Sequence, residues 1–83
     1  MEIKEFIKIR EERFGAVIFD TLSEKVFVTN ETGKDILNLL KEGKSKEEII
    51  DILEKKYESQ NNEIKIDVNE FIEQLEKNNI ISK

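Results

Sequence analysis

Residues 25–40 read KVFVTNETGKDILNLL, and the spacing of apolar side chains changes at Asn30. Before Asn30, the run at 25–29 is rich in β-branched and aromatic residues, which predicts a strand. After Asn30, apolar residues recur at helical spacing on one face: Ile36, Leu37 and Leu40. Asparagine is a favoured N-cap residue, so we expect a helix to begin directly after it. This junction separates a β half from an α half.

Upstream of the junction the sequence predicts two further strands. Ile7 and Ile9 alternate with polar residues, and residues 16–19 form a short apolar run. The polar stretch from Arg10 to Gly15 interrupts the two, and Gly15 is expected to form a turn or bulge. Another polar connection, residues 20–24, leads to the strand at 25–29. Short connections of this kind predict an antiparallel meander of three strands.

Downstream, Gly43 is expected to end the first helix, and Ser45 with Glu48 forms a capping box for a second. The apolar face of this second helix comprises Ile49, Ile50, Leu53 and Tyr57. Residues 59–62 have the composition of a linker. The sequence therefore predicts that a short loop connects the second helix to the third.

Asp67, with Glu70 three residues later, is expected to cap the third helix. The helix carries an apolar stripe at regular spacing, formed by Val68, Phe71, Ile72 and Leu75. Asn78 and Asn79 end it, and residues 80–81 are expected to dock on the core. The sequence thus predicts a single α+β domain over residues 1–83. In this domain a three-stranded antiparallel β-sheet is followed by a three-helix bundle, a winged-helix-like arrangement.

The composition argues against most kinds of active site. The 83 residues include no cysteine and no histidine, which removes thiol nucleophiles, imidazole bases and Cys/His metal sites. No glycine-rich phosphate loop or calcium loop is present, and the carboxylates fall at turns, caps and polar helix faces. We therefore expect no catalytic residue, no metal and no cofactor, and a protein that is not an enzyme.

The charge balance and hydropathy restrict the partners. The chain carries 19 acidic and 14 basic residues, a net charge of −5. A helix at 45–57 could act as a winged-helix recognition helix, but its exposed charges are balanced at best, so nucleic acid is not expected. The first residues contain no apolar targeting segment, and no apolar stretch is long enough to span a membrane. A cytoplasmic protein without a membrane partner is expected.

Peptide binding needs neither catalytic residues nor a basic surface. A small open sheet has edges, and an exposed edge can accept another strand. If residues 26–29 form such an edge, the third helix could provide an apolar wall beside it. The ordinary alternative is that this apolar stripe simply belongs to the core.

The chain resembles the PqqD-like proteins, which recognise the leader peptides of ribosomally made, post-translationally modified peptides. The resemblance covers residues 10–81 and rests on an ordered set of short phrases. These are residues 10–16 (REERFGA), 27–33 (FVTNETG), 35–37 (DIL), 40–45 (LKEGKS), 48–50 (EII), 67–68 (DV), 71–72 (FI), Leu75 and 79–81 (NII). Two positions depart from the family pattern, with Thr29 in place of an apolar residue and Asn79 in place of a glycine.

The resemblance implies a fold of three antiparallel strands followed by three helices, and a leader peptide that adds as a fourth strand between the third strand and the third helix. The implied edge consists of Lys25, Val26, Phe27, Val28 and Thr29. The implied apolar wall consists of Val68, Phe71, Ile72 and Leu75, with Glu76 and Lys77 on the rim. Since these four apolar residues cannot serve both purposes, at least half of them are expected in the core.

The resemblance also implies the partners. The chain would be a non-catalytic chaperone that presents a precursor peptide to a separate maturase, of the radical SAM type with a SPASM domain, as in the mycofactocin-like branch. The iron–sulfur cluster and S-adenosylmethionine would belong to that enzyme. A monomer is expected, with a strand-swapped dimer as the alternative. The alternative function is a small winged-helix-like transcriptional regulator or protein–protein adaptor.

Overall fold

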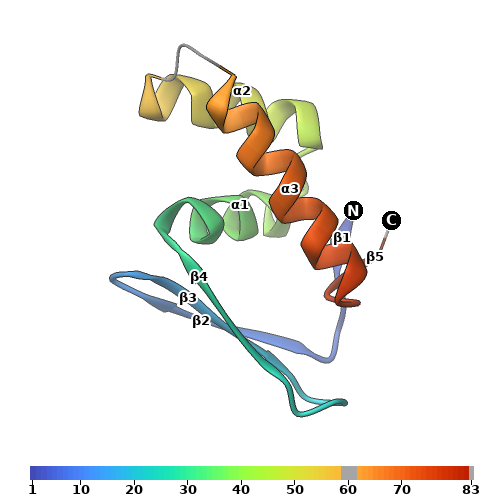
Figure 1. Ribbon diagram of the computed structural model, residues 1–83. Helices are drawn as coiled ribbons and strands as arrows, with labels where there is room; N and C mark the ends of the chain where they lie inside the picture. The colour runs from blue at the N-terminus through green and yellow to red at the C-terminus, as the bar shows by residue number, and fades with distance from the viewer. Residues whose placement is uncertain (59–61, 83) are drawn as a thin grey trace.

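The computed structural model describes residues 1–58 and 62–82 of the chain (Figure 1). The elements, in order, are β1 (Glu2–Ile3), β2 (Ile7–Glu12), β3 (Gly15–Asp20), β4 (Val26–Asn30), α1 (Glu31–Lys41), α2 (Lys46–Tyr57), α3 (Glu63–Lys77) and β5 (Ile81–Ser82). The main sheet precedes the helices, which confirms the predicted α+β class. Among these helices, none is both long and apolar enough to cross a membrane.

The main sheet has the order β2-β3-β4, and both pairs are antiparallel, as the meander prediction requires. The predicted interruption from Arg10 onward is wrong, because β2 continues to Glu12, which pairs with Gly15. The polar residues remain in the strand because alternate side chains of an antiparallel strand can face solvent. The side chains of Arg10 and Glu12, two positions apart, form an ion pair with an Nε–Oε2 distance of 2.8 Å.

Gly15 begins β3 in a conformation that only glycine adopts readily. Its φ is +154°, and a Cβ built on it would lie 1.9 Å from the carbonyl oxygen of Thr29. The backbones of β3 and β4 therefore approach each other more closely at this point than any side chain would allow. This contact fixes the position of the end of β4, where α1 begins.

All three helices lie on one side of the main sheet (Figure 1). The side chains of Ala16 and Ile18 in β3 are buried beneath them, and α1 packs directly against β3 and β4. The largest fully buried side chains come from β3, all three helices and the segment after α3: Ile18, Ile36, Leu37, Ile49, Leu53, Val68 and Ile80. The sheet and helices thus share one core, as expected for a small α+β domain.

The predicted starts of the first two helices are confirmed. The Asn30 side chain accepts a hydrogen bond from the Gly33 N–H at 2.9 Å. Ser45 and Glu48 form both bonds of a capping box, with the Glu48 N–H donating to the Ser45 hydroxyl and the Ser45 N–H to the Glu48 carboxylate. In α2, Tyr57 is more exposed than its place on the apolar face suggested, and its hydroxyl donates to the Asp35 carboxylate on α1.

The prediction that Asp67 caps the third helix is wrong. Helix α3 begins four residues earlier, at Glu63, and Asp67 lies inside it. The N-cap residue is Asn62, in the left-handed conformation, and its side chain makes no capping bond. The additional turn is stabilised by Ile64, which is buried one turn before Val68 and extends the apolar stripe toward the N-terminus.

A second, two-stranded sheet joins the two ends of the described chain and was not predicted. Glu2 pairs with Ser82, and Ile3 pairs with Ile81, in antiparallel register. Ile80 and Ile81 are buried, which confirms that the segment after α3 docks on the core. The ends of the chain consequently lie side by side (Figure 1).

The turn between β3 and β4 depends on Asp20. Its Oδ1 accepts hydrogen bonds from the N–H groups of Leu22 and Ser23, each at 3.0 Å. The bond from Ser23 is the main reason that the pKa of the Asp20 carboxyl lies below its ordinary value. A carboxyl whose pKa is lower in the folded state stabilises the fold above the unfolded-state pKa, and this contribution is lost as pH falls through the folded-state value.

We therefore expect Asp20→Asn to lower the urea midpoint of unfolding at pH 7, although asparagine keeps an acceptor oxygen for the turn. The gap between the two proteins should narrow in acid, as the wild-type carboxyl becomes protonated. Urea titrations of both proteins at pH 7 and pH 3 measure it. A gap that is the same at both pH values would show that the carboxylate charge is not what stabilises this turn.

Candidate functional site: the groove between β4 and α3

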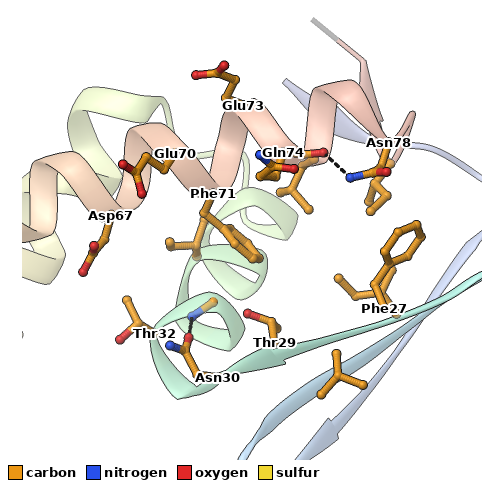
Figure 2. A pocket seen from close by; sticks show the side chains of 16 residues that line it. Phe27, Thr29, Asn30, Thr32, Asp67, Glu70, Phe71, Glu73, Gln74 and Asn78 are labelled. Carbon is orange, nitrogen blue, oxygen red and sulfur yellow. Dashed lines mark hydrogen bonds between the residues drawn. The ribbon is translucent and has the colours of Figure 1, made fainter.

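A groove runs between β4 and α3, with the first turns of α1 at one end (Figure 2). Its volume is about 810 Å³, which is within the range of about 300–1,000 Å³ typical of ligand sites. Its floor is apolar and buried, and consists of Ile18, Ile36, Leu75 and Ile80. We call this feature the β4–α3 groove.

The pleat of β4 decides which of its side chains face the β4–α3 groove. Phe27 and Thr29 line the groove and are half-buried, and Figure 2 shows both on the side that faces α3. Val26 and Val28 are 56% and 67% exposed. Because successive side chains of a strand point to opposite faces, these two valines lie on the outer face of the sheet, although Val28 also borders the groove.

The backbone of β4 presents an edge. The Asp20 N–H donates to the Lys25 carbonyl at 2.9 Å, so these facing residues form a hydrogen-bonded pair. In an antiparallel ladder such pairs alternate with non-bonded pairs. Along the β3–β4 register, the N–H and C=O groups of Phe27 and Thr29 are therefore directed to β3, and those of Val26 and Val28 outward. In the described part of the chain, no strand pairs with that outer side of β4.

On α3, Phe71 is the half-buried aromatic residue of the groove wall, and its ring points into the groove in the close-up view (Figure 2). Leu75 lines the floor but is itself buried. Val68 and Ile72 are 0% and 4% exposed and do not line the groove. The stripe of α3 is thus divided between core and groove.

The remaining residues of the sequence-based site lie at its margins. Lys25 is exposed and precedes β4, and it does not line the groove. Glu76 is half-buried on α3 and does not line it either. The structure therefore brings together Phe27, Val28, Thr29, Phe71 and Leu75 from the sequence-based set around one groove.

The sequence analysis missed the polar residues of the groove. The wall formed by α3 also includes Asp67, Glu70, Glu73, Gln74 and Asn78, and the end near α1 includes Asn30, Thr32 and Gly33. A helical signal for the wall exists, since Asp67, Glu70, Gln74 and Asn78 are spaced by three or four residues. Without knowledge of which helix face is turned to β4, the pattern is indistinguishable from an ordinary solvated face.

Chemically, the groove offers backbone donors and acceptors on one side and an apolar floor with a polar wall on the other. Such a site suits an extended peptide, which can pair with the strand edge while alternate side chains enter the groove. Within the described residues, no group of three or more Asp and Glu side chains is placed to hold a metal ion.

Comparison with known proteins agrees with this geometry. The family model for coenzyme PQQ synthesis protein D (PqqD) matches residues 15–81. The chain belongs to the PqqD family. The match begins at the start of β3 and runs to β5, and it includes both walls of the β4–α3 groove. A search of curated proteins finds no match for this member of the PqqD family.

Two solved structures share the fold of this PqqD-family chain. One is TbiB1 in complex with the TbiA(beta) leader peptide, with a TM-score of 0.87 and 24% identity, covering 96% of this chain and 93% of that one. The other is lasso peptide synthetase B1 complexed with the leader peptide, with a TM-score of 0.81 and 22% identity, covering 93% and 91%. At these identities the likeness establishes the fold.

Proposed function

We propose that this chain binds the leader segment of a ribosomally made precursor peptide, which adds as a strand to β4 in the β4–α3 groove. The observation that carries the proposal is the outer edge of β4, where the outward backbone groups of Val26 and Val28 pair with no strand of the described chain, beside a groove with an apolar floor. Membership of the PqqD family supports it, as do the two structures of the same fold that contain leader peptides.

In this proposal the residues of the site have different roles. Val26 and Val28 supply backbone hydrogen bonds, while Phe27, Thr29, Phe71 and Leu75 contact the side chains that enter the groove. Val68 and Ile72 hold α3 on the core and so keep the wall in place. Lys25 precedes β4, and Glu76 lies on α3 between the lining residues Leu75 and Asn78; both are outside the lining and can contact flanking residues of a longer peptide.

The protein would act without catalysing a reaction. It would hold the precursor and present it to a separate maturase, proposed to be a radical SAM enzyme with a SPASM domain, in the cytoplasm. The iron–sulfur cluster and S-adenosylmethionine belong to that enzyme. The physical benefit is effective concentration, since tethering can raise the local substrate level to roughly millimolar. We propose a monomer, because one chain alone supplies both walls of the groove.

The test is fluorescence polarisation of labelled leader peptides from short reading frames beside the gene, titrated with the full chain. We expect saturable binding that unlabelled leader competes away and a scrambled leader does not. The neighbouring maturase, added at saturating leader, should raise the polarisation further. Absence of binding by every candidate, with and without the enzyme, would overturn the proposal in favour of a protein–protein adaptor.

A further inference from the structure

The charges of the β4–α3 groove are unevenly distributed. Asp67 and Glu70 lie at the end near Asn30 and Thr32, whereas the amide side chains of Gln74 and Asn78 lie toward the end with Phe27 (Figure 2). None of the described residues that line the groove is a lysine or an arginine. The groove therefore has an acidic end and a neutral end.

Among the described residues, no lysine or arginine lines the acidic end. Glu73 forms an ion pair with Lys77, at an Nζ–Oε1 distance of 3.6 Å, and its carboxylate is turned away from the groove in Figure 2. Asp67 and Glu70, in contrast, form no ion pair with any other described residue. Two carboxylates without an ion-pair partner, beside an apolar floor, create a local negative potential, because the low-dielectric floor focuses the field.

The spacing of this acidic end matches that of a strand. Asp67 and Phe71 are four residues apart on α3, which corresponds to a rise of about 6 Å along the helix. Side chains on one face of a strand recur about every 6.6–6.8 Å. A peptide strand that places one side chain against Phe71 therefore brings the side chain two positions along it close to Asp67.

We infer that the groove selects peptide segments in which a lysine or arginine stands two positions from an apolar anchor residue. The anchor packs between Phe27 and Phe71 on the apolar floor, and the cation lies between the carboxylates of Asp67 and Glu70. This inference rests on the proposed function, and it specifies the chemistry of the segment that is bound.

The first experiment identifies that chemistry without knowledge of the natural precursor. Random peptides displayed on a surface are selected for binding to the full wild-type chain, and the selected clones are retested on Val28→Pro to retain those that need the β4 edge. We expect the retained peptides to be enriched in lysine or arginine two positions from an aliphatic or aromatic residue. Edge-dependent peptides without this enrichment would overturn the inference and leave the proposed function intact. Peptides that bind Val28→Pro equally well would count against the proposed function itself.

The second experiment exchanges the charges. One selected peptide, and its variant with the basic residue replaced by glutamate, are titrated against wild type and against the double variant Asp67→Lys/Glu70→Lys. We expect the selected peptide to bind the double variant about tenfold more weakly, and the glutamate peptide to recover most of that loss. The matched control is Glu47→Lys, an exposed carboxylate on α2 outside the groove lining, which should change the affinity by less than about twofold.

A double variant that weakens both peptides equally would show that the substitutions act through the fold or the backbone contacts, and would overturn the charge selection. Raising the salt concentration should reduce the advantage of the selected peptide over its glutamate variant in the wild-type protein, since screening weakens exposed charge pairs. An advantage independent of salt would overturn it as well.

Discussion

A Val28→Pro variant is expected to fold and to bind a leader peptide at least about tenfold more weakly than wild type, a loss of about 1.4 kcal/mol or more. The outward N–H of Val28 is the donor that an added strand would use, and proline removes it. The ring also occupies the space through which the strand must approach. Folding should survive, because the ladder to β3 does not use this N–H and edge strands tolerate proline.

The measurement is the polarisation titration, with circular dichroism and a urea midpoint to verify folding. Val28→Ala is the matched control, because it removes the same exposed side chain but retains the N–H, and we expect near wild-type affinity. Thr29→Pro serves as the opposite control, since its N–H is directed to β3 and its loss should destabilise the sheet. Unchanged affinity in a folded Val28→Pro protein would show that the peptide does not pair with this edge.

Gly15→Ala is expected to destabilise the protein by about 3 kcal/mol or more, which can prevent folding of so small a domain. The added Cβ would lie 1.9 Å from the Thr29 carbonyl oxygen and 2.5 Å from backbone atoms of Asn30. These are backbone atoms of the neighbouring strand, so the clash cannot be relieved by rotation of a side chain.

Gly43→Ala is the control for backbone conformation alone. Gly43 also has a positive φ, of +83°, but a Cβ there would meet nothing within 4 Å. We expect a cost of about 1–2 kcal/mol, that of the left-handed conformation. Urea or thermal unfolding of both variants measures the difference. Equal losses would mean that the β3–β4 approach at Gly15 relaxes easily, and that strain of the glycine conformation is the whole effect.

The helix starts that sequence predicted correctly are those made by local chemistry. Asn30 and Ser45 cap with their own side chains, so the signal lies within four residues. The start of α3 was missed because Asn62 provides no side-chain cap and the additional turn depends on the burial of Ile64, a tertiary contact. β1 and β5 were missed for a related reason. Each has two residues, and their pairing joins positions some 80 residues apart.

The two elements that form the groove could be predicted from the sequence, but the side chains that line it could be predicted only in part. The alternation in 26–29 and the stripe at Val68–Leu75 indicate an edge and an amphipathic helix, and the family resemblance placed them together. Which side of α3 faces β4 depends on how α3 packs against α1 and α2, so Val68 and Ile72 could not be distinguished from Phe71 in advance. The acidic end, formed by Asp67 and Glu70, could not be recognised for the same reason.

The pairing of β1 with β5 also determines how the molecule responds to mechanical force. Glu2 faces Ser82, and Ile3 faces Ile81, so a pull on the two ends opens this pair one residue at a time, like a zipper. Bonds broken one after another resist a pull much less than bonds broken together, and terminal segments are among the parts of a fold that open at the lowest free energy. A force applied to both ends of the chain would therefore first separate β1 from β5. The β2-β3-β4 sheet and its groove lie farther along the chain and would yield only afterwards.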